Sequence, residues 1–170
     1  MYMQKELPVR KNIRLSGYDY SSAGYYFITI CVKDRREMLG KIVGAASCRP
    51  LDPPSIELSE YGEIAQSWIA RRSEKYPYVK IDCHVVMPNH FHMILVIQDV
   101  NGRHDAAPTT ATLGQIMGYY KYQTTKEINI PGFWQRLYHD RIIRNEAEYQ
   151  RIGQYIDENP ARWTEDDYFV

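Results

Sequence analysis

The sequence lacks a net charge of either sign and any long hydrophobic run. Its 170 residues include 21 basic and 21 acidic side chains, so the formal net charge is zero. No apolar stretch reaches the roughly 18–20 residues that a membrane-spanning helix needs, and the segment Met1–Pro8 has no apolar core of the signal-peptide kind. We therefore expect a cytoplasmic protein with no membrane partner. The overall charge does not by itself indicate a nucleic-acid binder, whose usual footprint is strongly basic.

Cysteine is also scarce. Cys31, Cys48 and Cys83 are odd in number, widely spaced and without a Cys-x-x-Cys pair. This usage favours a reduced, cytoplasmic setting, because it does not suggest a framework of disulfides.

Tyrosine, in contrast, is abundant, and the basic residues are clustered. The chain has 15 tyrosines, and basic side chains gather at 10–14, 33–36, 71–72 and 136–144. A folded chain could therefore present one positive face, and aromatic rings beside basic side chains suit stacking on unpaired bases. The alternative is that most tyrosines are ordinary core or half-buried strand residues.

The order of predicted elements indicates an α+β fold. Strands are predicted at 25–32, 37–43, 78–87, 90–97 and 133–143, and helices at 59–76, 112–128 and 145–159. The first two strands are expected to pair as a hairpin. Such hairpins with two or three helices imply an antiparallel sheet covered on one face, a sandwich of the ferredoxin-like kind. We expect residues 1–170 to form one domain with its core at about 24–163, and loops near 44–55 and 98–111 to be insertions.

The segment Met87–His92, with the sequence Met-Pro-Asn-His-Phe-His, leads into the predicted strand 90–97. Alternate strand residues point to opposite faces, so His90 and His92 should project side by side while Phe91 packs on the other face. Two imidazoles one strand repeat apart are a natural pair of metal ligands. Taken alone, the pair could equally be one solvent-facing histidine and one that is hydrogen-bonded in the core.

The last predicted helix supplies a nucleophile and a third ligand. Tyr155 and Asn159 are four residues apart and therefore share one helical face. The amide oxygen of Asn159 suits Mg²⁺ or Mn²⁺ beside imidazoles. The phenol of Tyr155 can attack phosphorus when a divalent ion stabilises the developing charge. On this segment alone, Tyr155 could simply pack, and Asn159 could simply end the helix before Pro160.

In combination, Met87–His92 and the segment Tyr155–Pro160 (Tyr-Ile-Asp-Glu-Asn-Pro) resemble the single-tyrosine HUH transposases of the IS200-like type. Within that family they resemble the REP-associated tyrosine transposase group most. The resemblance covers the chain from about Gly24 to Trp163. It implies a ferredoxin-like domain whose C-terminal helix carries a nucleophilic tyrosine.

The resemblance implies that His90, His92 and Asn159 hold a divalent metal, Mg²⁺ or Mn²⁺. It implies that Tyr155 attacks a phosphate of single-stranded DNA near a hairpin, forms a 5′-phosphotyrosine and releases a 3′-hydroxyl. Reversal would rejoin strands without an external energy source, because the ester bond is retained. Asn159 is one methylene shorter than the glutamine of more distant relatives, so it could bind the metal directly or through a water.

The expected partners are hairpin-forming single-stranded DNA and a second copy of the chain, with the protein associated with the nucleoid when DNA is bound. Candidate contacts to the DNA backbone are Arg14, Lys121, Arg136 and Arg141. Three alternatives stay open at this point: a non-catalytic hairpin-binding relative, a rolling-circle initiator or relaxase, and a phosphohydrolase that uses activated water. The intact His90, His92 and Tyr155 argue against a loss of catalysis. Whether Tyr155 serves its own metal site or that of a partner is also open.

Overall fold

The computed structural model describes residues 14–44, 54–99 and 111–170. Most of the two predicted loops, Cys48 and the basic residues before Arg14 lie outside these ranges. The elements are β1 (Gly24–Cys31), the 3₁₀ turn η1 (Lys33–Arg35), β2 (Gly40–Val43), β3 (Ser55–Leu58), α1 (Glu60–Lys75), β4 (Val79–Val86), β5 (His90–Ile97), α2 (Leu113–Ile128), β6 (His139–Ile143), α3 (Glu146–Glu158) and the 3₁₀ segment η2 (Asn159–Glu165).

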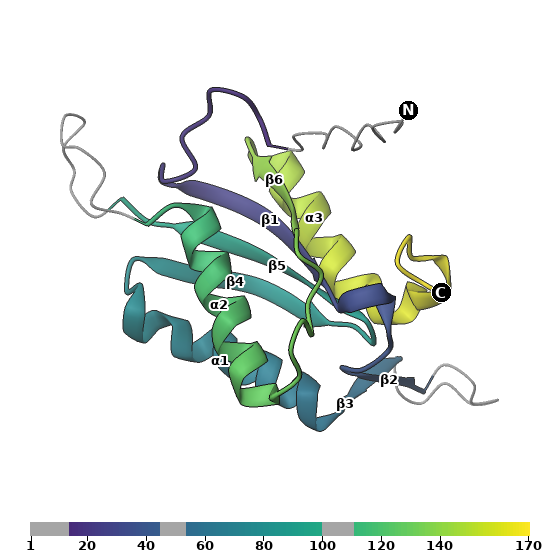
Figure 1. Ribbon diagram of the computed structural model, residues 1–170. Helices are drawn as coiled ribbons and strands as arrows, with labels where there is room; N and C mark the ends of the chain where they lie inside the picture. The colour runs from purple at the N-terminus through teal and green to yellow at the C-terminus, as the bar shows by residue number, and fades with distance from the viewer. Residues whose placement is uncertain (1–13, 45–53, 100–110) are drawn as a thin grey trace, which may run out of the picture.

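A four-stranded antiparallel sheet lies at the centre of the molecule. Its strands run side by side in the order β4-β5-β1-β6 (Figure 1). With α1 after β1 and α2 after β5, the chain follows the β-α-β-β-α-β path of a ferredoxin-like domain. The predicted fold class is therefore confirmed. The two central strands, β1 and β5, pair with each other along their whole length.

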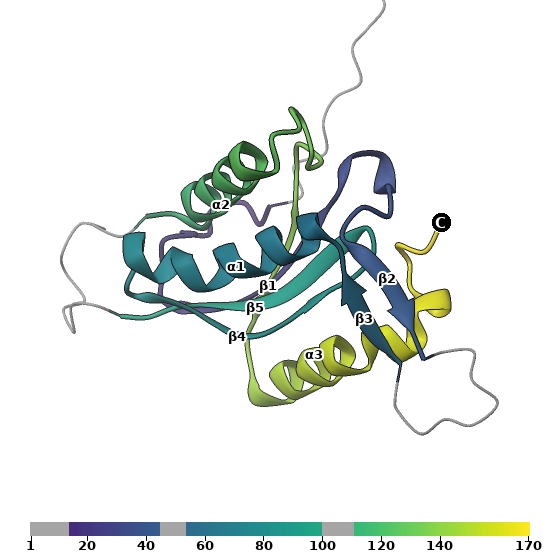
Figure 2. The ribbon, with the colours of Figure 1, turned by 90° about the horizontal axis from the view of Figure 1, so that it is seen from below.

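The sheet is covered on both faces, and the prediction of one covered face is wrong. Figure 2 shows α1 and α2 on one side of the sheet and α3 on the other. Phe91 and Leu95 of β5 join the core beneath α1 and α2, whereas Ile94 packs with Ile152 and Ile156 of α3. Because β5 is covered on both faces, it is nearly apolar throughout instead of alternating.

The predicted hairpin between 25–32 and 37–43 is also wrong. β1 pairs with β5 and β6, while β2 pairs with β3 in a separate two-stranded sheet. Between β1 and β2, Asp34 and Arg35 adopt left-handed backbone conformations with φ of 58° and 53°. These conformations interrupt extended structure after β1, so that β2 leaves the central sheet.

The strand predicted at 133–143 is confirmed only in its second half, as β6. Residues 133–138 do not form a strand, and Trp134 makes only an isolated bridge with Val32. The carbonyl oxygens of the next two residues accept hydrogen bonds from the ammonium group of Lys121 instead of a sheet partner.

The first residue of each predicted helix range is the N-cap of that helix. Ser59, Thr112 and Asn145 each accept, through a side-chain oxygen, a hydrogen bond from the backbone N–H three residues later. The helix α3 ends at Glu158, and Pro160 follows in η2, which carries the chain across the end of the sheet. In the described ranges, no helix has the length and apolar character required to span a membrane.

Candidate active site

His90 and His92 lie side by side on the face of β5 that α3 covers. Their Nε2 atoms are 3.0 Å apart, and the two side chains are 0% and 1% exposed. Phe91 points to the opposite face, where its ring contacts Tyr120 and Trp134. The arrangement predicted from strand alternation is confirmed, and neither histidine faces solvent.

Each imidazole is held in orientation by a hydrogen bond through its other nitrogen. Nδ1 of His90 lies 2.8 Å from Oδ1 of Asn89. The amide nitrogen of Asn89 donates to two backbone carbonyl groups, which fixes the amide so that its oxygen faces His90. Nδ1 of His90 therefore carries the proton and Nε2 keeps its lone pair. His92 is held in the same way by a 2.8 Å hydrogen bond between its Nδ1 and Thr29 Oγ1.

Burial keeps both imidazoles neutral. Desolvation lowers the pKa of His90 to about 4. It also lowers the pKa of His92 well below the usual value, with the neighbouring His90 adding to the effect. A neutral imidazole with a free Nε2 is the form that binds metal ions.

The helix α3 brings Tyr155 to the histidines. Its hydroxyl oxygen lies 3.1 Å from Nε2 of His92 and donates a 2.8 Å hydrogen bond to Oδ2 of Asp166. The side chain remains 39% exposed. Burial of the hydroxyl, together with the hydrogen bond to Asp166, raises the pKa of Tyr155 above that of a free phenol. Because Tyr155 and His92 belong to one chain, the site can assemble without a partner.

Asn159 follows Tyr155 by one helical turn and is buried at the end of α3. Its amide nitrogen donates a 2.8 Å hydrogen bond to the same carboxylate oxygen of Asp166. Its amide oxygen is buried and has no hydrogen-bond partner. Burying an acceptor without a hydrogen-bond partner lowers the stability of the folded protein. A bound cation would give this oxygen a partner.

Asp166 is not among the residues predicted from the sequence. One ligand atom from each of His90, His92 and Asp166 lies within 4.8 Å of the other two. Nothing in the sequence distinguishes Asp166 from the acids on either side, because its position depends on how η2 turns the chain back towards β5. Tyr168 was also missed, and its ring centroid lies 4.5 Å from that of His90.

These donor groups fit a divalent cation. The two imidazoles are buried, and a carboxylate oxygen of the half-buried Asp166 lies within 4.8 Å of a nitrogen of each. The unpartnered amide oxygen belongs to buried Asn159, whose amide nitrogen donates to that carboxylate. Mixed nitrogen and oxygen donors of this kind suit Mn²⁺, and the oxygen donors also suit Mg²⁺. His90, His92 and Asn159 stay the predicted ligands, and the carboxylate of Asp166 lies between the histidine pair and the amide of Asn159.

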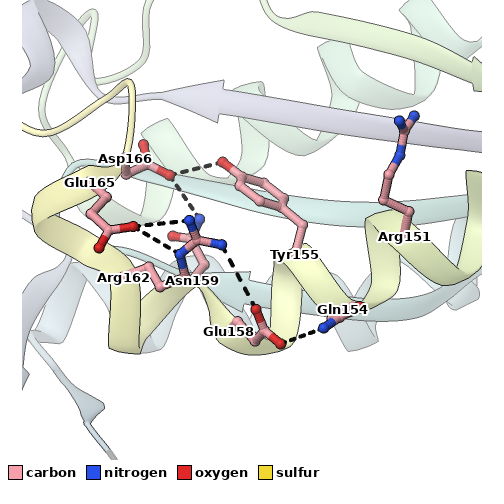
Figure 3. Close-up of a pocket in the computed structure, with 8 residues that line it drawn as sticks. All are labelled: Arg151, Gln154, Tyr155, Glu158, Asn159, Arg162, Glu165 and Asp166. Carbon is pink, nitrogen blue, oxygen red and sulfur yellow. Dashed lines mark hydrogen bonds and ion pairs between the residues drawn. The ribbon is translucent and has the colours of Figure 1, made fainter.

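A pocket of about 340 Å³ opens beside Tyr155. It is lined by Arg151, Gln154, Tyr155, Glu158, Asn159, Arg162, Glu165 and Asp166 (Figure 3). Arg162 forms ion pairs with Glu158 and Glu165 at one end of the pocket. Arg151, one turn before Tyr155 on α3, is exposed at the other end.

The other tyrosines of helices α2 and α3 do not reach the histidines. Tyr119, Tyr120 and Tyr122 belong to α2, on the opposite face of the sheet. Tyr149 lies on α3, but its hydroxyl donates to the carboxylate of Asp82. Tyr155 is the tyrosine of these two helices that lies beside His92, and Tyr168, beyond η2, also contacts the histidine pair.

The basic residues predicted to contact DNA do not line this pocket. They are Arg14, Lys121, Arg136 and Arg141. Arg14 lies 3.8 Å from Asp140, and Arg141 lies 2.6 Å from Glu148. Lys121 is engaged with backbone carbonyl groups, and Arg136 is exposed. Their contacts with DNA stay predictions.

Comparison with known proteins identifies both a fold and a relative. A solved structure of a REP-associated tyrosine transposase bound to a REP hairpin matches with a TM-score of 0.64 and 20% identity, over 88% of this chain and 73% of that chain. An uncharacterized protein of Haemophilus influenzae is 34% identical over 177 residues, which cover 95% of this chain and 93% of that protein. No protein-family model matches the chain.

The fold is therefore that of the REP-associated tyrosine transposases, as the motifs implied. The chain belongs to one family with the Haemophilus influenzae protein.

Proposed function

We propose that this protein is a metal-dependent tyrosine transposase that cleaves and rejoins single-stranded DNA near hairpins. The observation that carries the proposal is the position of the Tyr155 hydroxyl, 3.1 Å from Nε2 of His92 and beside a buried pair of neutral imidazoles. The match to a transposase fold that was solved with a REP hairpin supports DNA as the partner.

His90, His92 and Asn159 would hold a divalent ion, Mg²⁺ or Mn²⁺, with Asp166 close to the same position. When bound, such an ion polarises a phosphate and stabilises the charge that develops during attack. Asn89 and Thr29 keep the two imidazoles oriented for this role.

Tyr155 acts as the nucleophile. Its oxygen forms a bond to phosphorus, the bond from phosphorus to the 3′-oxygen breaks, and the released strand ends in a 3′-hydroxyl. The 5′-phosphate stays on Tyr155. Attack by a 3′-hydroxyl on this phosphotyrosine reverses the step and rejoins strands, because the energy of the ester bond has been retained.

DNA would approach through the pocket beside Tyr155. Arg151 lies at one end of this pocket, where its guanidinium group could contact a backbone phosphate. The more distant basic residues, Arg14, Lys121, Arg136 and Arg141, are further candidates for contacts with a flanking hairpin. A homodimer stays a prediction, and the contact between Tyr155 and His92 within one chain does not require it.

A covalent-adduct assay tests the proposal. The protein is incubated with Mn²⁺ or Mg²⁺ and single-stranded DNA that carries a hairpin with natural flanking sequence, and the products are resolved on a denaturing gel. We expect a protein–DNA adduct that Tyr155→Phe abolishes. Tyr149→Phe is the matched control, because this tyrosine lies on the same helix but faces Asp82.

Two results would overturn the proposal. The first is the absence of an adduct with every flanking substrate. The second is DNA hydrolysis without an adduct that continues in Tyr155→Phe, which would indicate a phosphohydrolase that uses activated water.

A further inference from the structure

The proton of the Tyr155 hydroxyl has two acceptors within hydrogen-bond distance among the described residues. One is Nε2 of His92 at 3.1 Å, and the other is Oδ2 of Asp166 at 2.8 Å. A phenol that attacks phosphorus has to lose this proton. The phenol of a tyrosine ordinarily titrates at about pH 10, so it carries its proton at neutral pH. The proposed reaction therefore requires a group that accepts this proton.

His92 is the weaker of the two candidates. Its Nε2 faces Nε2 of His90 at 3.0 Å, and this is the lone pair that a metal ligand uses. Its Nδ1 is engaged with Thr29. Once the imidazole pair serves as ligands, neither nitrogen of His92 is available to accept the proton.

Asp166, in contrast, is held with its carboxylate against the phenol. Oδ2 accepts hydrogen bonds from both Tyr155 and Asn159 (Figure 3). Oδ1 accepts a 2.7 Å hydrogen bond from the backbone N–H of Tyr168. The backbone N–H of Asp166 donates to the carbonyl group of Trp163, which fixes the residue at the end of η2. A general base needs a geometry of this kind, within about 2.6–3.2 Å of the proton that it removes.

We propose that Asp166 is a catalytic residue that accepts the proton of Tyr155 as the phenol oxygen attacks the phosphate. The proposal rests on the proposed transposase function. The O–H bond of Tyr155 breaks, its proton moves to Oδ2 of Asp166, and the phenol oxygen bonds to phosphorus while the 3′-oxygen leaves with its electron pair. The leaving 3′-oxygen takes this proton from Asp166, which returns to the carboxylate form. On rejoining, Asp166 accepts the proton of the attacking 3′-hydroxyl and returns it to the phenol oxygen as the bond between Tyr155 and phosphorus breaks.

The same carboxylate could act only as a metal ligand, because it lies within 4.8 Å of both histidines. The two roles make different predictions. A ligand contributes to metal affinity, and its loss cannot be compensated by a more acidic nucleophile. A proton acceptor contributes little to metal affinity, and the need for it falls when the phenol is more acidic.

The test compares Asp166→Asn with Asp167→Asn. Asparagine keeps the size of Asp166 and can still accept a hydrogen bond from Tyr155, but it cannot take the proton. Asp167 is the matched control, because it is an exposed acid one residue further along the chain. We expect Asp166→Asn to slow adduct formation by about 10²–10⁴-fold, while its Mn²⁺ affinity, measured by calorimetry, stays close to that of the unmodified protein. Asp167→Asn should change neither quantity.

A second measurement separates proton transfer from a loss of structure. Tyr155 is replaced by 3,5-difluorotyrosine, whose phenol is more acidic, in the unmodified protein and in Asp166→Asn. We expect the fluorinated phenol to restore much of the rate lost in Asp166→Asn and to change the rate of the unmodified protein far less. A variant that had merely lost its structure would not be rescued.

Three outcomes would overturn the role of Asp166. They are equal adduct rates in Asp166→Asn and Asp167→Asn, a loss of Mn²⁺ affinity as large as the loss of rate, and no rescue by the fluorinated phenol. Failure of the unmodified protein to form any adduct would instead overturn the transposase function, so the two failures are distinguishable.

Discussion

The hydroxyl of Thr29 orients His92 through a hydrogen bond to Nδ1. Substitution by valine removes this hydroxyl and keeps the shape of the side chain. We expect Thr29→Val to lower Mn²⁺ affinity by about 10–100-fold, because partners that orient metal-binding histidines typically contribute this much. The change leaves Nδ1 of His92 buried without its partner. Calorimetric titration with Mn²⁺ measures the effect.

The control for this variant is Thr29→Ser, which keeps the hydroxyl and removes only a methyl group. It should retain most of the affinity. Equal losses in the valine and serine variants would mean that packing around Thr29, and not its hydrogen bond, supports the site.

Burial of His90 makes the stability of the metal-free protein depend on pH. The folded-state pKa is about 4 and the ordinary value is 6.5. Between these values the unfolded chain binds more protons than the folded chain, so the free energy of unfolding rises with pH in this window. The contribution of His90 to the free energy of unfolding is fully present above pH 6.5 and is lost as the pH falls towards 4.

Urea unfolding in the presence of a chelator measures this pH dependence. We expect His90→Gln to reduce the slope between pH 6.5 and about 4, and part of the slope to remain because His92 is also buried with a lowered pKa. His139→Gln, at an exposed histidine of β6, should leave the slope unchanged. A slope that is the same in all three proteins would contradict a neutral, buried His90.

At the scale of elements, the docking of α3 on the sheet positions Tyr155. Ile156, the next residue, is 1% exposed and packs against Ile94 and Ile152. We expect Ile156→Ala to lower the free energy of unfolding by about 2–5 kcal/mol, because it leaves a cavity beneath the helix. Adduct formation should fall as well, since Tyr155 depends on the same packing. Chemical unfolding and the adduct assay measure the two effects.

The graded control is Ile156→Val, which removes one methylene and should cost about 0.5–1.5 kcal/mol. If alanine and valine cost equally little, α3 would not be held by this core, and another contact would have to position Tyr155.

At the scale of the whole molecule, basic and acidic side chains are equal in number but unevenly placed, so a basic residue can still lie beside the pocket. Arg151 is exposed beside Tyr155. We expect Arg151→Gln to weaken binding of single-stranded DNA and to reduce the salt dependence of the binding constant by about 0.7 in the log–log slope, the value for one phosphate contact. Fluorescence anisotropy at several salt concentrations measures both quantities.

Arg71→Gln is the matched control. Arg71 lies on α1, on the opposite face of the sheet, where it pairs with Glu127. It should leave the slope unchanged. The same effect in both variants would indicate a general charge effect and not a contact near Tyr155.

Patterns among nearby residues were enough to predict most helices and strands and the shared face of the two histidines. The caps at Ser59, Thr112 and Asn145 depend on hydrogen bonds within one turn, so the start of each helix could be predicted from nearby residues. The same holds for His90 and His92, whose shared face follows from the two-residue repeat of a strand.

Pairing between distant segments could not be predicted in this way. Strand β2 has the composition of a partner for β1 but pairs with β3, because the left-handed turn at Asp34 and Arg35 directs the chain away from the sheet. The contact between Asp166 and Tyr155 could not be predicted either, because it forms only after η2 has reversed the chain.

The sequence by itself determined the class of fold, the shared face of the two histidines and the shared face of Tyr155 and Asn159, because these follow from the periodicities of strand and helix. The tertiary structure decided that α3 covers the second face of the sheet, that Tyr155 meets His92 of its own chain, and that Asp166 lies against the phenol. The reason is physical: periodicity fixes the face on which a residue lies, but only the packing of the core against α3 fixes what that face meets.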